Sequence, residues 1–149
     1  MAIEDGRVVG FIAISIHTKE FFKQFLKTKV FSNLHLIPFA TFGKIFFIKS
    51  LEVLKYPFSN KITNKIFISN SEIFNFCVDG CQQGQGVGKL LFSKAIKQLE
   101  ASQIKTLKIV TGQMQVNAQR FYYKSGATLS HRIMIHKGEE SMVFKYKIN

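Results

Sequence analysis

The sequence contains only two cysteines, Cys77 and Cys81, among its 149 residues. Two thiols four positions apart are too few to build the disulfide framework of a small secreted protein, and no histidine lies near them at a zinc-ligand spacing. The N-terminal residues, Met1 to Gly6, have neither the basic start nor the apolar run of a signal peptide. We therefore expect free thiols, no bound metal and a cytoplasmic location.

The chain also lacks an uncharged segment long enough to span a bilayer. The longest, Val30 to Gly43, has about 14 residues and includes Asn33, His35 and Pro38, whereas a transmembrane helix needs about 20 apolar residues. Lysines flank the phenylalanine-rich stretches, so an amphipathic helix on a membrane surface is one interpretation. Packing of these stretches on the sheet or on a second subunit, as in a homodimer, is the other.

Acidic residues are scarce, with 9 Asp and Glu against 21 Lys and Arg, and the net charge is +12. A basic domain attracts anions, and nucleic acid is the first partner to consider. The lysines are spread along the whole chain, however, and the phenylalanines lie within apolar runs. The charge fits a protein that handles phosphate-bearing small molecules, and a merely solvated lysine surface explains it too, with a nucleic-acid-binding module as an alternative of another class.

The length and the 46% hydrophobic content predict a single domain over residues 1–149. A helical insert, rich in Phe, Leu, Ile and Lys, is expected at about residues 18–64, with two or three short helices. The other expected elements are strands at Ala2–Glu4 and Val8–Ile16 around an Asp5-Gly6 turn, a strand at Glu72–Val78, a helix at about Gly88–Ala101, a strand at Thr106–Thr111, a helix at about Val116–Ser125, and a terminal strand pair, Thr128–His136 and Ser141–Lys147.

A glycine-rich loop, Gln83-Gly84-Gln85-Gly86-Val87-Gly88, joins the expected strand at Glu72–Val78 to the helix that follows. Glycines let a ligand approach the backbone, and the first N–H groups of a helix are unpaired and favour an anion. Lys89 adds a positive charge. The loop is therefore predicted to bind phosphate.

The glycine spacing excludes two common phosphate motifs. A Walker A loop would need glycine at Gln83 and a hydroxyl residue at Leu90, and a dinucleotide fingerprint starting at Gly84 would need glycine at Lys89. The pattern that remains is Q/R-x-x-G-x-G/A, filled by Gln83, Gly86 and Gly88. In this the chain resembles the GNAT superfamily of N-acetyltransferases, which use the loop to bind coenzyme A.

A second segment, Gln115 to Gly126, is similar to the GNAT signature N-x-x-A-x-x-F-Y-x-x-x-G, with Ala118, Phe121, Tyr122 and Gly126 in register. It departs from the pattern at Gln115, where Asn is usual, and at Ala127, where Phe is usual. The resemblance implies that acetyl-CoA is bound by a larger set of residues, namely Phe76, Cys77, Val78, Gln83, Gly84, Gln85, Gly86, Val87, Gly88, Lys89, Gln115 and Asn117.

The resemblance also implies a fold and a chemistry. The fold is a mixed, mostly antiparallel sheet flanked by helices, here with a helical insert and without the usual first strand and helices. Tyr122 would be the acid that protonates the departing thiolate, while Tyr123 lies about 100° round the helix and faces elsewhere. A strand bulge near Phe76 to Val78 would supply a backbone N–H to the oxyanion, and Glu72 is the leading base, ahead of His17, His35, His131 and His136.

The acceptor is the least determined part of this prediction. The narrower resemblance is to bacterial transferases of surface-polysaccharide synthesis, which acetylate an amino sugar. The insert carries eight lysines against Glu20 and Glu52, which favours an amino sugar on a nucleotide carrier over a cationic peptide or polyamine. A protein or small-amine acetyltransferase, and a non-catalytic CoA-binding module, are the alternatives.

Overall fold

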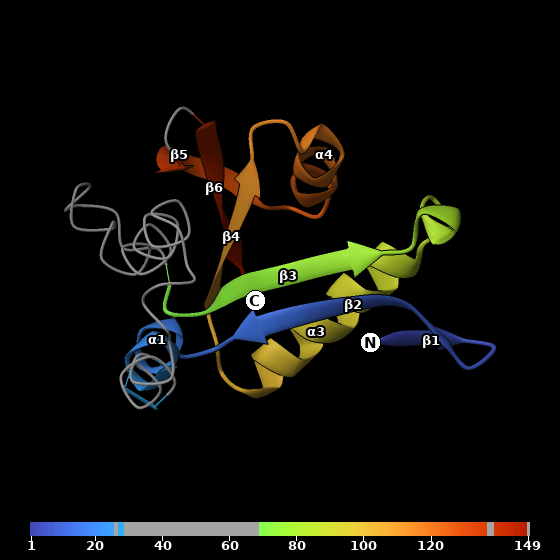
Figure 1. The fold of residues 1–149 in the computed structure, drawn as a ribbon, viewed down its shortest axis with the longest axis horizontal. Coiled ribbons are helices and arrows are strands. Elements are labelled where there is room, and N and C mark those ends of the chain that lie inside the picture. Colours follow the sequence, from blue (N-terminus) through green and yellow to red (C-terminus); the bar gives the residue numbers. More distant parts are fainter. Residues whose placement is uncertain (26, 29–68, 137–138, 149) are drawn as a thin grey trace, which may run out of the picture.

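The computed structural model describes residues 1–25, 27–28, 69–136 and 139–148 (Figure 1). These residues form a six-stranded sheet of order β1-β2-β3-β4-β6-β5, in which only β3 and β4 pair in parallel. The predicted mixed, mostly antiparallel sheet flanked by helices is confirmed. The elements are β1 (Ala2–Glu4), β2 (Arg7–Ser15), α1 (Thr18–Phe25), β3 (Glu72–Val78), the 3-10 turn η3 (Gly80–Gln82), α3 (Val87–Ala101), β4 (Thr106–Gly112), α4 (Val116–Lys124), β5 (Thr128–His136) and β6 (Glu139–Lys147).

The N-terminal hairpin forms as the Asp5-Gly6 dipeptide predicts. Both turn residues have positive φ, 48° and 75°, which is the conformation of the two-residue turns that match the twist of paired strands. β2 then pairs antiparallel with β3. Helix α1 follows at the start of the predicted insert, and the insert from residue 29 to its predicted end at about residue 64 lies outside the described residues.

The core lies between the sheet and one face of α3, where Leu91, Phe92, Ala95 and Leu99 are buried at the predicted helical spacing. Helix α4 reaches the same core, because the rings of Phe92 and Tyr122 lie 6.0 Å apart. On the sheet the core side chains include Ile73, Leu107, Ile109 and Phe144. Since side chains alternate along a strand, the residues between them face the opposite side of the sheet.

Strands β3 and β4 pair over only two residue pairs, Glu72 with Lys108 and Ile73 with Ile109. Figure 1 shows the two strands meeting at their first residues and diverging toward their carboxyl ends, with α3 beside one and α4 beside the other. β6 inserts between β4 and β5, and it begins two residues before the predicted start at Ser141 because the ladder with β5 continues to Glu139. The divergence of β3 and β4 creates the site described next.

Candidate functional site

A cavity of about 650 Å³ lies between the diverging strands. Its walls come from β3, from the glycine-rich loop and the start of α3, from the end of β4, and from α4. The lining residues are Ile73, Phe74, Asn75, Phe76, Val78, Gln83, Gly84, Gly88, Val110, Thr111, Met114, Gln115, Val116, Asn117, Ala118, Phe121 and Tyr122. Both predicted motifs therefore line a single cavity.

The glycine-rich loop has the shape of an anion site at a helix start. Gly84 and Gly86 have φ values of 80° and 88°, which L side chains rarely adopt. Apart from the adjacent residues, no atom of the described part of the chain lies within 4 Å of where their Cβ atoms would stand. Gly86 caps α3, and the first helical bond runs from the N–H of Leu90 to its carbonyl oxygen. The N–H groups of Val87, Gly88 and Lys89 therefore precede the helical bonding pattern, as a phosphate site requires.

Seven of the predicted coenzyme residues line the cavity and five do not. The seven are Phe76, Val78, Gln83, Gly84, Gly88, Gln115 and Asn117. Cys77 is exposed on the opposite face of the sheet because it lies between Phe76 and Val78 in the strand. The other four, Gln85, Gly86, Val87 and Lys89, lie beside the lining residues in the loop and the first turn of α3. The amide of Gln85 donates to the carbonyl of Cys81 at 2.9 Å, which fixes the loop itself.

Two glutamines hold the turn between β4 and α4. Gln115, the N-terminal cap of α4, accepts a hydrogen bond from the N–H of Gly112 at 3.2 Å. Gln119 is buried and donates to the carbonyls of Gly112 and Gln113, each at 2.9 Å. Our sequence reasoning missed Gln119, although its position one helical turn after Gln115 places both on one face of α4.

Tyr122 is buried in the wall of the cavity, with 4% of its surface exposed. Burial raises the pKa of its phenol to about 12, so the hydroxyl is protonated at neutral pH. Its ring lies among those of Phe76, Phe92, Phe121 and Phe144, at centroid distances of 5.4 to 6.4 Å. Tyr123 is 48% exposed and does not line the cavity, as the 100° rotation per residue predicts.

The bulge in β3 lies earlier than predicted. Ala13 of β2 pairs with Asn75 and Ile14 pairs with Ile73, which leaves Phe74 as the additional residue. The predicted position, Phe76 to Val78, is wrong because that segment pairs in regular register with Ile12, Phe11 and Gly10 of β2. Phe74 lines the cavity, so the bulge is still part of its wall.

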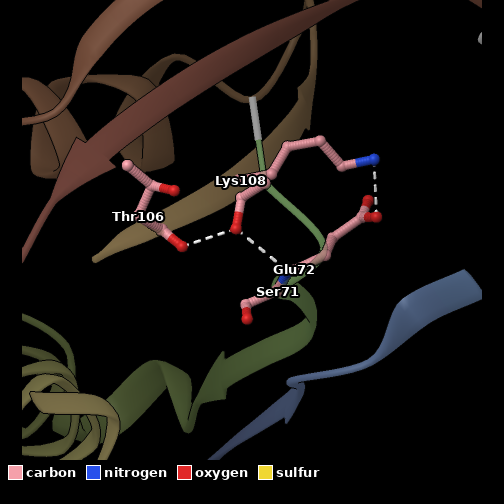
Figure 2. Close-up of polar contacts among 5 residues, drawn as sticks. Ser71, Glu72, Thr106 and Lys108 are labelled. Atoms are coloured by element: carbon pink, nitrogen blue, oxygen red, sulfur yellow. Dashed lines mark hydrogen bonds and ion pairs between the residues drawn. The ribbon is translucent and has the colours of Figure 1, made fainter. Parts of the chain in front are cut away.

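Glu72 lies at the start of β3, outside the cavity lining. Its carboxylate is 2.6 Å from the ammonium of Lys108, its register partner in β4, and Figure 2 shows the two side chains turned toward each other. Only 3% of the Glu72 side chain and 14% of that of Lys108 are exposed. Glu72 is therefore a buried ion-pair member rather than a strand-end carboxylate in solvent.

Of the four histidines, His131 has a perturbed environment. Burial and, secondly, the positive charge of Lys108 lower its pKa, so its imidazole is neutral at pH 7. The Nδ1 atom lies 3.1 Å from the hydroxyl of Ser130. His17 precedes α1, His136 ends β5, and His35 lies outside the described residues. Neither His17 nor His131 lines the cavity.

Within the part of the chain that the structure describes, no helix is long and apolar enough to cross a membrane.

Comparison with known proteins tests the family resemblance. Residues 59–140, more than half of the chain, match the family model described as "Acetyltransferase (GNAT) domain". A search of curated proteins finds no match. Among solved structures, the fold is similar to a putative acetyltransferase of the GNAT family from Desulfovibrio desulfuricans (14% identity, TM-score 0.50, 53% of each chain covered).

Two further structures show the same likeness. Ard1 from Thermoplasma volcanium is 17% identical with a TM-score of 0.50, over 53% of this chain and 55% of that one. Nourseothricin acetyltransferase is 18% identical with a TM-score of 0.50, over 53% and 50%. The chain thus aligns with about half the length of these structures. GNAT acetyltransferases use acetyl-CoA as acetyl donor, and the match over residues 59–140 establishes that this chain belongs to the GNAT acetyltransferase family.

Proposed function

We propose that the protein is an N-acetyltransferase that moves the acetyl group of acetyl-CoA to a primary amine. One observation carries the proposal: a single cavity runs from the glycine-rich loop at the start of α3 to the buried, protonated Tyr122. A phosphate site and a proton donor at separate places in one cleft are what an acetyl-CoA-dependent transfer needs.

The residues present fit acetyl-CoA. Gln83, Gly84 and Gly88, together with the first N–H groups of α3, would hold its phosphates, and Lys89 adds charge close by. Phe76 and Val78 of β3 and Gln115 and Asn117 of α4 would hold the chain between the phosphates and the thioester. Acetyl-CoA, when bound, supplies an acetyl group activated as a thioester.

Three groups of the protein would then act on the transfer. A backbone N–H beside the Phe74 bulge would donate to the carbonyl oxygen as it gains charge. The hydroxyl of Tyr122 would donate to the sulfur as the carbon–sulfur bond breaks and the new carbon–nitrogen bond forms. A base receives the proton that the amine loses; Glu72, the base predicted from the resemblance, does not line the cavity.

The pKa of Tyr122 limits how it acts. A free thiol has a pKa near 8.5, about 3.5 units below the phenol, so complete proton transfer to the thiolate is uphill by about 5 kcal/mol. Tyr122 is therefore expected to stabilise the departing sulfur through a hydrogen bond, and solvent protonates the thiolate after release.

For the acceptor we propose an amino sugar on a nucleotide carrier, with a protein or small amine as the alternative. The net charge of +12 supports a substrate that carries phosphates. A thiol-release assay with nucleotide amino sugars, peptides and polyamines tests this choice, and added salt should raise KM for the diphosphate substrates only. Turnover of a lysine peptide without any response to a nucleotide sugar would reject it.

Coenzyme binding is tested first, by thermal unfolding with and without acetyl-CoA. At 100 times Kd the expected stabilisation is about 2.7 kcal/mol. Gly86→Glu places a carboxylate at the anion site and should abolish the stabilisation. Gly86→Gln is the matched control, because it imposes the same strain at φ 88° and nearly the same volume without the charge.

Comparison of Gly86→Glu with Gly86→Gln separates the effect of a negative charge on coenzyme binding from the effect of a larger side chain. We expect Gly86→Gln to retain more coenzyme affinity than Gly86→Glu. An unchanged melting curve of the wild-type protein with acetyl-CoA or CoA would reject the proposed function and favour a non-enzymatic module.

A further inference from the structure

Several polar contacts hold the closed end of the cleft. The N–H of Lys108 donates to the carbonyl of Ser71 at 2.8 Å, and the hydroxyl of Ser69 donates to the carbonyl of Thr106 at 2.5 Å. The hydroxyl of Ser71 donates to the carbonyl of Ile16, the residue that directly follows β2. Together with the Glu72–Lys108 ion pair, drawn in Figure 2, these contacts join β2, β3 and β4 at one point.

That point lies at the start of the short ladder, just before β3 and β4 separate. Glu72 and Lys108 are the first of only two register pairs between the strands, and the second pair is Ile73 with Ile109. The cavity walls start immediately afterwards, at Ile73 in one strand and Val110 in the other. The ion pair therefore stands at the apex of the angle between the two walls.

The carboxylate of Glu72 lies on the side of the sheet that faces away from Tyr122. Ile73, the neighbour of Glu72, belongs to the core cluster that includes Tyr122, and Lys108 lies between the core residues Leu107 and Ile109. Because side chains alternate along a strand, Glu72 and Lys108 face the other side of the sheet. This position suits a structural contact between the strands better than proton transfer inside the cavity.

We propose that Glu72 and Lys108 form a strand clamp, the ion pair that fixes where β3 and β4 part and so sets the width of the coenzyme cleft. Both are then positioning residues, and this inference rests on the proposed function. A buried charge that loses its partner is strongly disfavoured, so the pair resists any sliding or widening at the apex. Small displacements there are carried to Phe76 and Tyr122, which lie on the two walls.

The test uses Glu72→Gln, Lys108→Met, the double variant, and Lys108→Arg as the conservative control. Calorimetry gives the Kd for acetyl-CoA, and thiol release gives kcat and KM. Hydrogen exchange of the β3 and β4 amides, measured without ligand, shows how often the two strands open at the ion pair. We expect each neutralising variant to weaken coenzyme binding about tenfold or more and to speed amide exchange, with Lys108→Arg close to wild type. The double variant should recover most of the affinity and turnover, because it removes both charges of the pair together.

Catalysis by Glu72 as the base gives a different pattern and would overturn the clamp. Glu72→Gln and the double variant would then both lose turnover at unchanged coenzyme affinity, while Lys108→Met would keep an unchanged Kd. If neither single variant folds, the double variant still decides between recovered and lost turnover. Absence of acetyl-CoA binding in the wild type would reject the proposed function instead, and amide exchange would still test the clamp.

Discussion

Replacing Tyr122 with phenylalanine is the sharpest test of the proposed chemistry, because the change removes the hydroxyl that would donate to the sulfur and keeps the ring. The ring makes the contacts with Phe76, Phe92, Phe121 and Phe144, and these are retained. Among the described residues the Tyr122 hydroxyl makes no hydrogen bond to the protein, so its loss leaves no partner unsatisfied. The variant is expected to fold and to bind acetyl-CoA with nearly unchanged Kd.

The size of the expected effect follows from the pKa of about 12. Since full proton transfer to a thiolate is unfavourable, the hydroxyl contributes one hydrogen bond to a charged group, worth about 1.5 to 3 kcal/mol. At 1.4 kcal/mol per factor of ten, kcat should fall about 10- to 150-fold. The assay is thiol release at saturating acetyl-CoA, with Kd measured separately by calorimetry.

Tyr123→Phe is the matched control, since Tyr123 is on the same helix but outside the cavity. We expect its kcat to equal that of the wild type. Equal kcat of Tyr122→Phe and wild type would remove Tyr122 from the mechanism. A fall in coenzyme affinity that accounts for the whole loss of activity would assign Tyr122 to binding instead.

Three predictions concern stability. In Gly10→Ala the new Cβ would stand 3.0 Å from the backbone oxygen of Cys77 and from Cδ1 of Leu91. Urea denaturation should therefore show that the free energy of unfolding falls by about 1 to 3 kcal/mol, and an unchanged midpoint would contradict this packing. The pKa of tyrosine is near 10 in the unfolded chain, and burial raises the pKa of Tyr122 to about 12 in the folded protein. The free energy of unfolding should therefore fall by about 2.7 kcal/mol as the pH rises from about 10 to about 12. A similar fall in Tyr122→Phe would show that Tyr122 is not its cause. Among the described residues, the buried hydroxyl of Thr111 has no hydrogen-bond partner, so Thr111→Val should raise the free energy of unfolding by about 1 kcal/mol. A destabilised variant would contradict this.

Local patterns were sufficient for much of the site. The turn dipeptide Asp5-Gly6, the apolar spacing of α3 and the register of Tyr122 with Gly126 are properties of neighbouring residues, and the structure confirms the elements they predict. The bulge could not be placed in this way. It depends on which residues of β2 face β3, and the pairing of Ala13 with Asn75 and Ile14 with Ile73 is a property of two strands.

By itself, the sequence determined the order of the elements, the glycine-rich turn and the rotation of Tyr122 toward the core, because propensity and periodicity act within a few residues. Only the tertiary structure decided the surroundings of Glu72. Lys108 is 36 positions away along the chain, and the two meet because they are register partners in the short parallel ladder of β3 and β4. The same short ladder makes the strands diverge, and so the closing contact and the cleft have one physical cause.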